Sequence, residues 1–392
     1  MSNRCALLKP GKEKSLERRH PWIFSGAIAS LPPDIQPGEL LPVFSHAEKW
    51  LALAYFHSGH SLTGRVLSFE NIAIEELLEK KFSSAAALRK ELIDCKRTNG
   101  FRLINAEGDG LPGLIVDRYG DTLVIQLTTQ GMERLRPLII KGLVQQFSPL
   151  GIFEKSRGSA RLQEGLEQIE GHVWGRTSEQ VEIRENDLRF LVSLEHGQKT
   201  GFFFDQREMR NWVASRAKDK RVLNGFSYTG GFSVAALRGG AAHVDSVDIC
   251  SHAIELLEKN MALNGFSQKN HAAFCEDLFD FLTSRSLKDY DLIILDPPAF
   301  AKKRNDVENA CRGYKQLMRS AMQGARSGAF LLISSCSYYM DELLFQNLAA
   351  QAACEANRSV RIISSHIQAS DHPVSLAHPE GRYLKSLILQ LA

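Results

Sequence analysis

Short apolar stretches separated by turn residues characterise the first 70 or so residues of the chain. Glycine, proline or polar residues bound each stretch, as at Pro37-Gly38. This pattern is typical of short β-strands and predicts a small β domain or barrel. The predicted strands cover residues 22–24, 40–44, 50–56 and 61–67.

The spacing of the apolar positions changes after this segment. Between residues 72 and 96 they recur at helical spacing in an otherwise charged stretch, which predicts a helix or helix pair that joins two domains. Strand patterns return over 101–126 and 151–155, with a helical pattern over 132–146 between them. The centre of the chain is therefore predicted to be a second small α/β unit.

The C-terminal part alternates strand and helix patterns after a predicted hairpin around Asn186-Asp187. Because apolar runs alternate with helices, the pattern predicts a doubly wound parallel sheet with seven strands. The predicted strands cover 221–226, 243–249, 272–274, 291–295, 329–334, 360–364 and 383–391. The predicted helices cover 233–237, 252–263, 314–322 and 341–355. The predicted domains are residues 1–72, 73–178 and 179–392, with the major boundary near 175–185.

Composition narrows the class of protein. With 392 residues, 44% of them hydrophobic, the chain is long enough for two or three folded domains, which excludes a wholly disordered protein. No apolar run approaches the roughly 20 residues that span a bilayer, and no signal-peptide segment opens the chain, so we expect a cytoplasmic protein without a membrane partner. The seven cysteines are odd in number and form no C-x-x-C pair, so we expect neither a disulfide framework nor a metal site.

The net charge of +3 is too small to identify a nucleic-acid partner. The first 20 residues hold six basic side chains against two acidic ones, an excess that permits a polyanionic partner. A solvated basic terminus explains the same excess equally well.

Informative side chains follow the strands of the C-terminal sheet, where ligands of such sheets bind. The first strand runs into Asn224 and a loop with Gly230-Gly231, which suits the close approach of a ligand or simply a tight turn. The loop has no G-x-G-x-x-G pattern, so a cofactor without a pyrophosphate fits better than a dinucleotide. Asp248 and Asp277 end the next two strands, where one suits ribose hydroxyls and the other an adenine amino group; either alone also suits a helix cap. Together they favour an adenosine site.

Two further strand ends carry candidate substrate chemistry. The fourth strand ends in Asp296-Pro297-Pro298-Ala299-Phe300, where the prolines hold an acid and an aromatic ring in an extended loop suited to a planar substrate. The fifth strand ends at Cys336, which position alone leaves open as a nucleophile or a buried structural cysteine.

These motifs resemble the bacterial ribosomal large subunit methyltransferase I family, which methylates carbon 5 of a cytosine in 23S rRNA with S-adenosyl-L-methionine. The resemblance covers nearly the whole chain and implies an N-terminal PUA β-barrel, a small central α/β domain, a linking β-hairpin and a Rossmann-like, seven-stranded class I methyltransferase domain. The motifs that carry it are 19–22, 109–117, 197–207, 224–232, 296–300, 335–337 and 371–373.

The resemblance implies that Cys336 adds to carbon 6 of the cytosine and that Asp296 stabilises the charge on the base. The related guanine-N7 methyltransferases lack a cysteine at the Cys336 position. Many other RNA cytosine-C5 enzymes carry a second cysteine beside the motif's proline, which this chain lacks, so the base that removes the carbon 5 proton has no candidate. The residues expected to hold the cofactor are Asp205, Arg207, Asn224, Phe226, Tyr228, Thr229, Gly230, Asp248, Asp277 and Asp296.

Asp205 also resembles the first residue of a capping box with Glu208, so helix capping competes with a cofactor role. The expected partner is 23S rRNA or a large-subunit precursor, with a homodimer left open. Phe300 or Tyr228 is expected to stack on the unstacked cytosine unless the ring is core. The residues expected to bind flanking RNA are Lys302, Lys303, Arg18 and Arg19. Two alternatives stay open: methylation of a ring or exocyclic nitrogen, and a non-catalytic ribosome-assembly factor.

Overall fold

A computed structural model describes residues 4–301 and 303–392, which form two compact units. Among the described residues, the first unit contains 4–186, 192–204 and 370–381, and the second contains 187–191, 205–301, 303–369 and 382–392. The three-domain division expected from the sequence stays a prediction. Among the described residues, every helix is too short or too polar to cross a membrane.

The first unit begins with a six-stranded sheet in the order β2-β6-β5-β4-β1-β3. The four strands predicted in this segment are all present, because alternating side chains such as Leu41 and Val43 are buried in its core. β1 and β3 were not predicted. The elements are β1 (Ala6–Leu8), α1 (Lys14–Glu17), β2 (Trp22–Phe24), β3 (Ile28–Ser30), β4 (Glu39–Phe44), β5 (Trp50–Phe56) and β6 (Leu62–Ser68).

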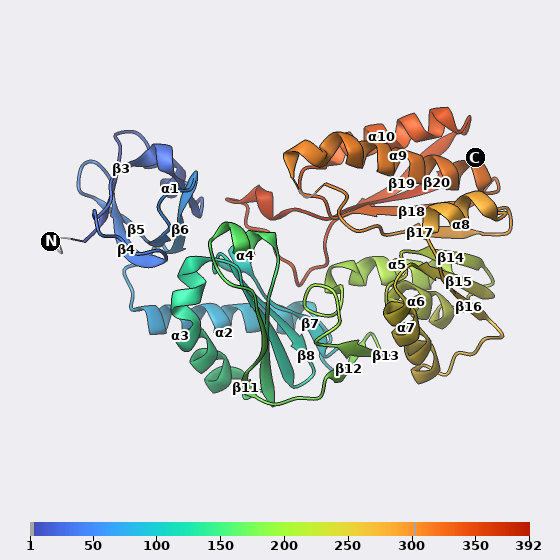
Figure 1. The fold of residues 1–392 in the computed structure, drawn as a ribbon, viewed down its shortest axis with the longest axis horizontal. Helices are drawn as coiled ribbons and strands as arrows, with labels where there is room; N and C mark the ends of the chain where they lie inside the picture. Colours follow the sequence, from blue (N-terminus) through green and yellow to red (C-terminus); the bar gives the residue numbers. More distant parts are fainter. Residues whose placement is uncertain (1–3, 302) are drawn as a thin grey trace. The chain divides into compact units, whose positions relative to one another are not determined.

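The same unit contains a five-stranded sheet in the order β11-β10-β9-β8-β7, packed against α2 and α3 (Figure 1). The helical spacing over 72–96 forms a single helix, and the predicted strands and second helix are confirmed. β11 was not predicted, because most of its residues are only partly buried and show no alternation. The elements are α2 (Ile74–Leu92), β7 (Gly100–Asn105), β8 (Leu114–Tyr119), β9 (Thr122–Leu127), α3 (Gln130–Phe147), β10 (Gly151–Ser156), α4 (Ser159–Gln163) and β11 (Ile169–Gly175).

The predicted hairpin is confirmed at β12 (Gln180–Glu185) and β13 (Leu188–Ser193). Asn186 and Asp187 connect the two strands with φ angles of 51° and 67°. Two consecutive left-handed residues are the geometry of a type I′ turn, for which Asn and Asp are among the favoured residues.

The second unit is built on a seven-stranded sheet in the order β16-β15-β14-β17-β18-β20-β19. The other strands are parallel to one another, as predicted, but β20 is antiparallel to both of its neighbours, which was not predicted. The strands are β14 (Arg221–Gly225), β15 (His243–Asp248), β16 (His271–Cys275), β17 (Leu292–Leu295), β18 (Phe330–Ser335), β19 (Val360–His366) and β20 (Lys385–Leu391). The helices are α5 (Arg207–Arg216), α6 (Gly231–Arg238), α7 (Ser251–Leu263), α8 (Leu278–Ser284), α9 (Val307–Gly324) and α10 (Glu342–Glu355).

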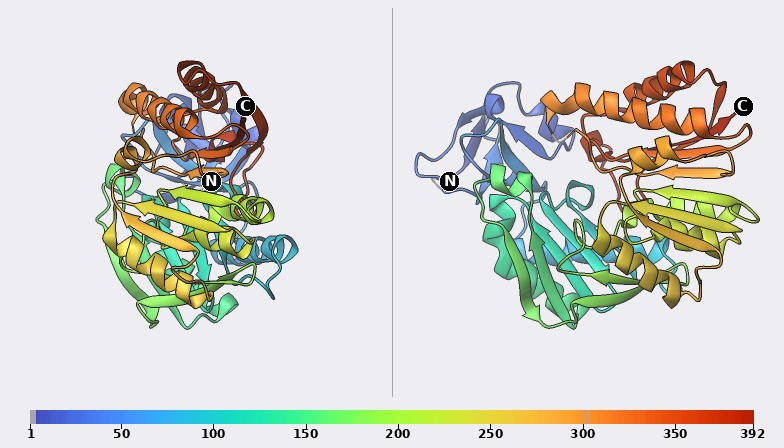
Figure 2. Two further views of the ribbon diagram at one scale, coloured as in Figure 1. Left: turned by 90° about the vertical axis from the view of Figure 1, so that its right-hand side faces the viewer. Right: turned by 45° about the vertical axis from the view of Figure 1, so that its right-hand side comes forward.

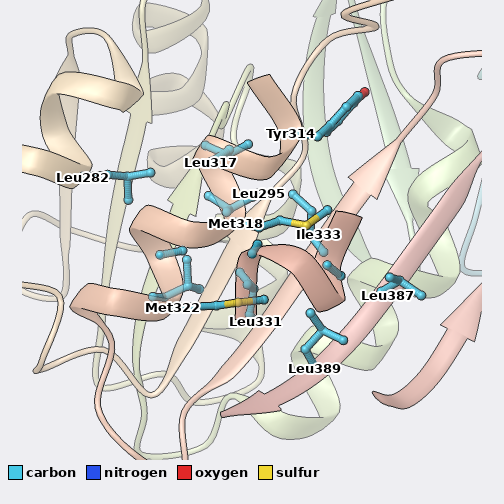
Figure 3. Close-up of a cluster of buried hydrophobic side chains, with 14 of the residues drawn as sticks. Leu282, Leu295, Tyr314, Leu317, Met318, Met322, Leu331, Ile333, Leu387 and Leu389 are labelled. Atoms are coloured by element: carbon cyan, nitrogen blue, oxygen red, sulfur yellow. The ribbon is translucent and has the colours of Figure 1, made fainter. Parts of the chain in front are cut away.

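Helices cover both faces of this sheet, which is why its central strands are continuous apolar runs (Figures 1 and 2). α9 and α10 lie side by side, and their apolar faces pack on β17, β18 and β20. Figure 3 shows Met318 of α9 beside Ile333 of β18 in this core. The tightly packed layer fixes the carboxyl ends of β17 and β18, where the candidate substrate residues follow.

Candidate active site

Five neighbouring parallel strands bring the predicted strand-end residues to one edge of the sheet. β14, β15 and β16 lead to Asn224, Asp248 and Asp277, while β17 and β18 lead to Asp296 and Cys336. The chain reverses its direction of strand addition between β14 and β17, so this edge is a topological switch point, the usual place for a ligand in such a sheet.

The loop after β14 has an unusual backbone. Phe226, Tyr228 and Gly230 have φ angles of 58°, 47° and 84°. The Asp248 carboxylate braces this loop by accepting the Tyr228 amide at 2.8 Å, and it also accepts the Cys250 amide at 2.9 Å. Asp248 is therefore held in place by the backbone and shapes the loop itself.

Asn224 begins a buried chain of hydrogen bonds across four elements, β14, α6, β15 and β16. Its Nδ2 donates to Ser233 Oγ at 2.7 Å, Ser233 Oγ is 2.6 Å from Ser246 Oγ, and Ser246 Oγ is 3.0 Å from His271 Nε2. Burial lowers the pKa of His271 to about 4, so its ring is neutral at physiological pH. The chain fixes the orientation of the Asn224 amide.

Two buried oxygens near this loop lack a hydrogen-bond partner within the described parts of the chain. These are Asn224 Oδ1 and Ser227 Oγ, from side chains that are 0% and 5% exposed. Buried polar atoms are normally satisfied, so both suit a polar ligand bound at the loop. The residues present therefore fit an adenosine-type cofactor.

Asp277 is the N-cap of α8. Its Oδ1 accepts the amides of Phe279 at 2.7 Å and Asp280 at 3.4 Å. The alternative expectation, that Asp277 caps a helix, is therefore confirmed. Any contact of Asp277 with an adenine amino group stays a prediction.

The segment before α5 corrects one expectation. Gln206, not Asp205, is the N-cap of α5, because a 3-10 turn over Phe204–Gln206 precedes the helix, so the predicted capping box is wrong. Asp205 instead accepts the Tyr383 hydroxyl at 2.6 Å. Gln206 was missed from the sequence, although its Nε2 donates to Asp296 Oδ1 at 2.9 Å and orients that carboxylate. Arg207 is buried at the start of α5.

The Asp296–Phe300 loop, residues 296–300, is anchored to the core. The half-buried Phe300 ring lies 4.7 Å from the ring of Tyr314 on α9, at an angle of 42°. The next amide, of Ala301, donates to Ser337 Oγ at 3.3 Å. Phe300 is therefore partly packed against the core, which leaves less of the ring for a base. Lys302 lies outside the described residues, and Lys303 is exposed.

Cys336 directly follows β18 and is partly buried. The residues on either side of it bond to the Tyr314 hydroxyl: Ser335 Oγ donates to it at 2.9 Å, and Ser337 Oγ lies 3.3 Å away. Burial raises the pKa of Tyr314, so this hydroxyl stays protonated. The turn that presents the thiol is thus fixed from both sides.

Two predicted RNA-binding residues belong to the first unit. Arg18 and Arg19 are exposed after α1, and the Arg19 guanidinium lies 4.9 Å from the centre of the Phe69 ring. Their exposure suits an RNA backbone, and their role stays a prediction.

The fold, the strand-end residues and two family models define the class. Residues 164–354 match the model of S-adenosylmethionine-dependent methyltransferases, and residues 7–69 match that of PUA-like domains. The protein is a methyltransferase that uses S-adenosylmethionine. Its fold is also that of a methyltransferase solved in complex with SAH, which is 26% identical, with a TM-score of 0.84 over 98% of this chain and 99% of that one.

Curated relatives identify the family. A ribosomal RNA large subunit methyltransferase I from Vibrio campbellii is 41% identical over 96% of this chain and 97% of that protein. The enzyme of the same description from Alteromonas mediterranea is 38% identical over 98% of both chains. The chain belongs to the ribosomal RNA large subunit methyltransferase I family.

Proposed function

We propose that this methyltransferase transfers a methyl group to carbon 5 of a cytosine in 23S rRNA, with Cys336 as the nucleophile. The observation that carries the proposal is the place of Cys336 at the end of β18. This strand lies beside β17, which leads to Asp296, and is two positions from β14. The relatives named as large-subunit rRNA methyltransferases support the choice of RNA.

The loop after β14 is proposed to hold the cofactor. Asn224 Oδ1 and Ser227 Oγ accept from it or bind it through water, and Asp248 accepts the ribose hydroxyls with the lone pairs that its backbone bonds leave available. Phe226, Thr229 and Gly230 line the same loop. When bound, S-adenosylmethionine supplies an electrophilic methyl group.

Carbon 5 of cytosine is a weak nucleophile, so the base must be activated first. The Cys336 thiolate adds to carbon 6, forming an S–C bond and giving carbon 5 enamine character. Asp296, held by Gln206, enters the step protonated and donates its proton to N3 of the base, where negative charge develops. After carbon 5 is methylated, water accepts its proton, and the electron pair of that C–H bond forms the C5–C6 double bond while the C6–S bond breaks and the Cys336 thiolate leaves. N3 then returns its proton to Asp296.

RNA must present an unstacked cytosine at this edge. Lys303 follows the Asp296–Phe300 loop and is exposed, so it suits a flanking phosphate, as proposed for Lys302, Arg18 and Arg19. Tyr338 and Tyr339 directly follow the Cys336 turn and are 54% and 40% exposed, which makes them further candidates for stacking on bases.

The test uses an rRNA fragment that contains 5-fluorocytosine, because fluorine at carbon 5 blocks the final elimination. The wild type should form a denaturant-stable adduct whose tryptic peptide contains Cys336. Cys336→Ala should form none, while Cys354→Ala, which removes an exposed cysteine on α10, should form it normally. A methyl group on a base nitrogen, or an adduct at a different cysteine, would overturn the proposal.

A further inference from the structure

We propose that Lys385 is a positioning residue for this reaction: its buried ammonium stabilises the thiolate of Cys336. The inference rests on the proposed function, because it assigns a partner to the same nucleophile.

Lys385 is bonded to the turn that presents Cys336. It is the first residue of β20 and pairs across the sheet with Ser335, the residue before the cysteine. Its Nζ donates to the carbonyl of Ser337, the residue after the cysteine, at 2.7 Å. A second bond, to the Tyr383 carbonyl at 2.7 Å, fixes the ammonium from the other side. Lys385 is therefore tied to both flanks of Cys336, by strand pairing to Ser335 and by its ammonium to Ser337.

Lys385 is only 6% exposed, and no carboxylate in the described residues lies within ion-pair distance of its Nζ. A buried ammonium without an anionic partner is costly, so its retention needs a reason. Two carbonyl dipoles satisfy its hydrogen bonds but leave its charge unneutralised. A thiolate at Cys336 supplies the missing negative charge.

The surrounding groups agree with this pairing. Burial lowers the pKa of Lys385 to about 8, while the Cys336 and Asp341 charges raise it and Arg382 lowers it. Tyr314 of α9 also faces Cys336, whose charge raises the pKa of the tyrosine. Because the interaction is reciprocal, a thiolate that favours the charged lysine is favoured by it.

Charge and hydrogen bonding can be separated by substitution. Lys385→Gln keeps a donor for the carbonyls but removes the charge, and Lys385→Arg keeps the charge. The measurement is the rate of iodoacetamide alkylation of Cys336 between pH 5 and 10, followed on its peptide by mass spectrometry. Cofactor binding and thermal unfolding report whether each variant is folded, and Lys385→Met is the second neutral variant if glutamine disturbs the fold.

In the neutral variants, the midpoint of the alkylation profile should move up by about one pH unit or more, and the rising limb of methyl transfer against pH should move with it. Lys385→Arg should restore most of the wild-type midpoint. An unchanged midpoint in a folded neutral variant would overturn the role of Lys385. A shifted midpoint in a protein that forms no 5-fluorocytosine adduct would retain the electrostatic pairing and overturn the proposed nucleophile instead.

Discussion

Two buried lysines, one in each unit, make a natural comparison. Lys155 on β10 donates to the carbonyls of Leu194 at 2.6 Å, Glu195 at 3.1 Å and Gly197. Lys385 donates to two carbonyls in the same manner. Burial lowers the pKa of each lysine to about 8.

The difference lies in the nearest negative charge. Glu170 places a carboxylate oxygen 3.9 Å from the Lys155 ammonium, so that lysine has an ion pair. Its hydrogen bonds also hold the loop that contains Leu194, Glu195 and Gly197. Lys385 has the Cys336 turn in place of a carboxylate. A lowered pKa therefore does not by itself mark a functional lysine; the chemistry of its neighbour does.

The contrast between Lys155 and Lys385 depends on Cys336 acting as the nucleophile, so removal of its thiol has the largest expected effect. Cys336→Ala should lower methyl transfer by at least about 10³-fold, because the substrate then lacks its activating nucleophile. Cofactor affinity, measured by calorimetry, should stay within about twofold of wild type. If Cys336→Ala retained its activity, Lys385 would have only a structural role, like Lys155.

The cofactor side of the same sheet edge provides the next contrast. Asp248→Ala should weaken S-adenosylmethionine binding by about 10- to 100-fold, because a braced charged acceptor and its loop contacts are lost. The exposed Asp280→Asn on α8 is the matched control and should bind normally. Alkylation of Cys336 against pH should be the same in both variants; a change after Asp248→Ala would show that the two sides are coupled.

The lowered pKa values of Lys155 and Lys385 predict that the protein becomes more stable as the pH rises. Both have folded-state pKa values of about 8, below the ordinary 10.5, so between these values the unfolded chain binds more protons than the native one. The free energy of unfolding should therefore rise from pH 8 to 10.5. Urea titrations should show a smaller rise in Lys155→Met and in Lys385→Met.

Cys336→Ala sharpens this experiment. Without the thiolate, the pKa of Lys385 should fall further and its part of the rise should grow, whereas the part due to Lys155 should not change. Equal behaviour of the two lysines in this background would contradict the pairing of Lys385 with Cys336.

Exposed charges should have the smallest effect. The double variant Arg18→Ala, Arg19→Ala should reduce the slope of log affinity for RNA against log salt by about 1.4 to 1.8, because two phosphate contacts release fewer counterions. Lys90→Ala, at an exposed position on α2, is the control. An unchanged slope would mean that these arginines face solvent in the complex.

The sheet and its strand-end residues could be predicted because each depends on residues that are adjacent in the sequence. The run Leu292–Leu295 is apolar at every position and is followed at once by Asp296, so both the strand and the edge can be read from adjacent residues. Short or half-exposed strands such as β1 and β11 lack that signal.

The supporting residues could not be found in this way. Gln206 is 90 residues from Asp296, and Lys385 is 48 residues from Ser337. These contacts arise only when distant segments fold together, and neither side chain stands in a distinctive motif. The Asp205 cap was wrong for a related reason, since the competing Tyr383 hydroxyl comes from 178 residues away.

The hydrogen-bond chain that begins at Asn224 has one direction. The amide Nδ2 can only donate, so Ser233 accepts from it and gives its own proton to Ser246, which gives its proton to the bare nitrogen of His271. The imidazole proton then resides on Nδ1. Were His271 protonated at both nitrogens, this relay would have to reverse, and Asn224 would turn its NH₂ group to where its carbonyl now points. A histidine on β16 thus acts as the terminus that sets whether the loop after β14 offers an acceptor or a donor.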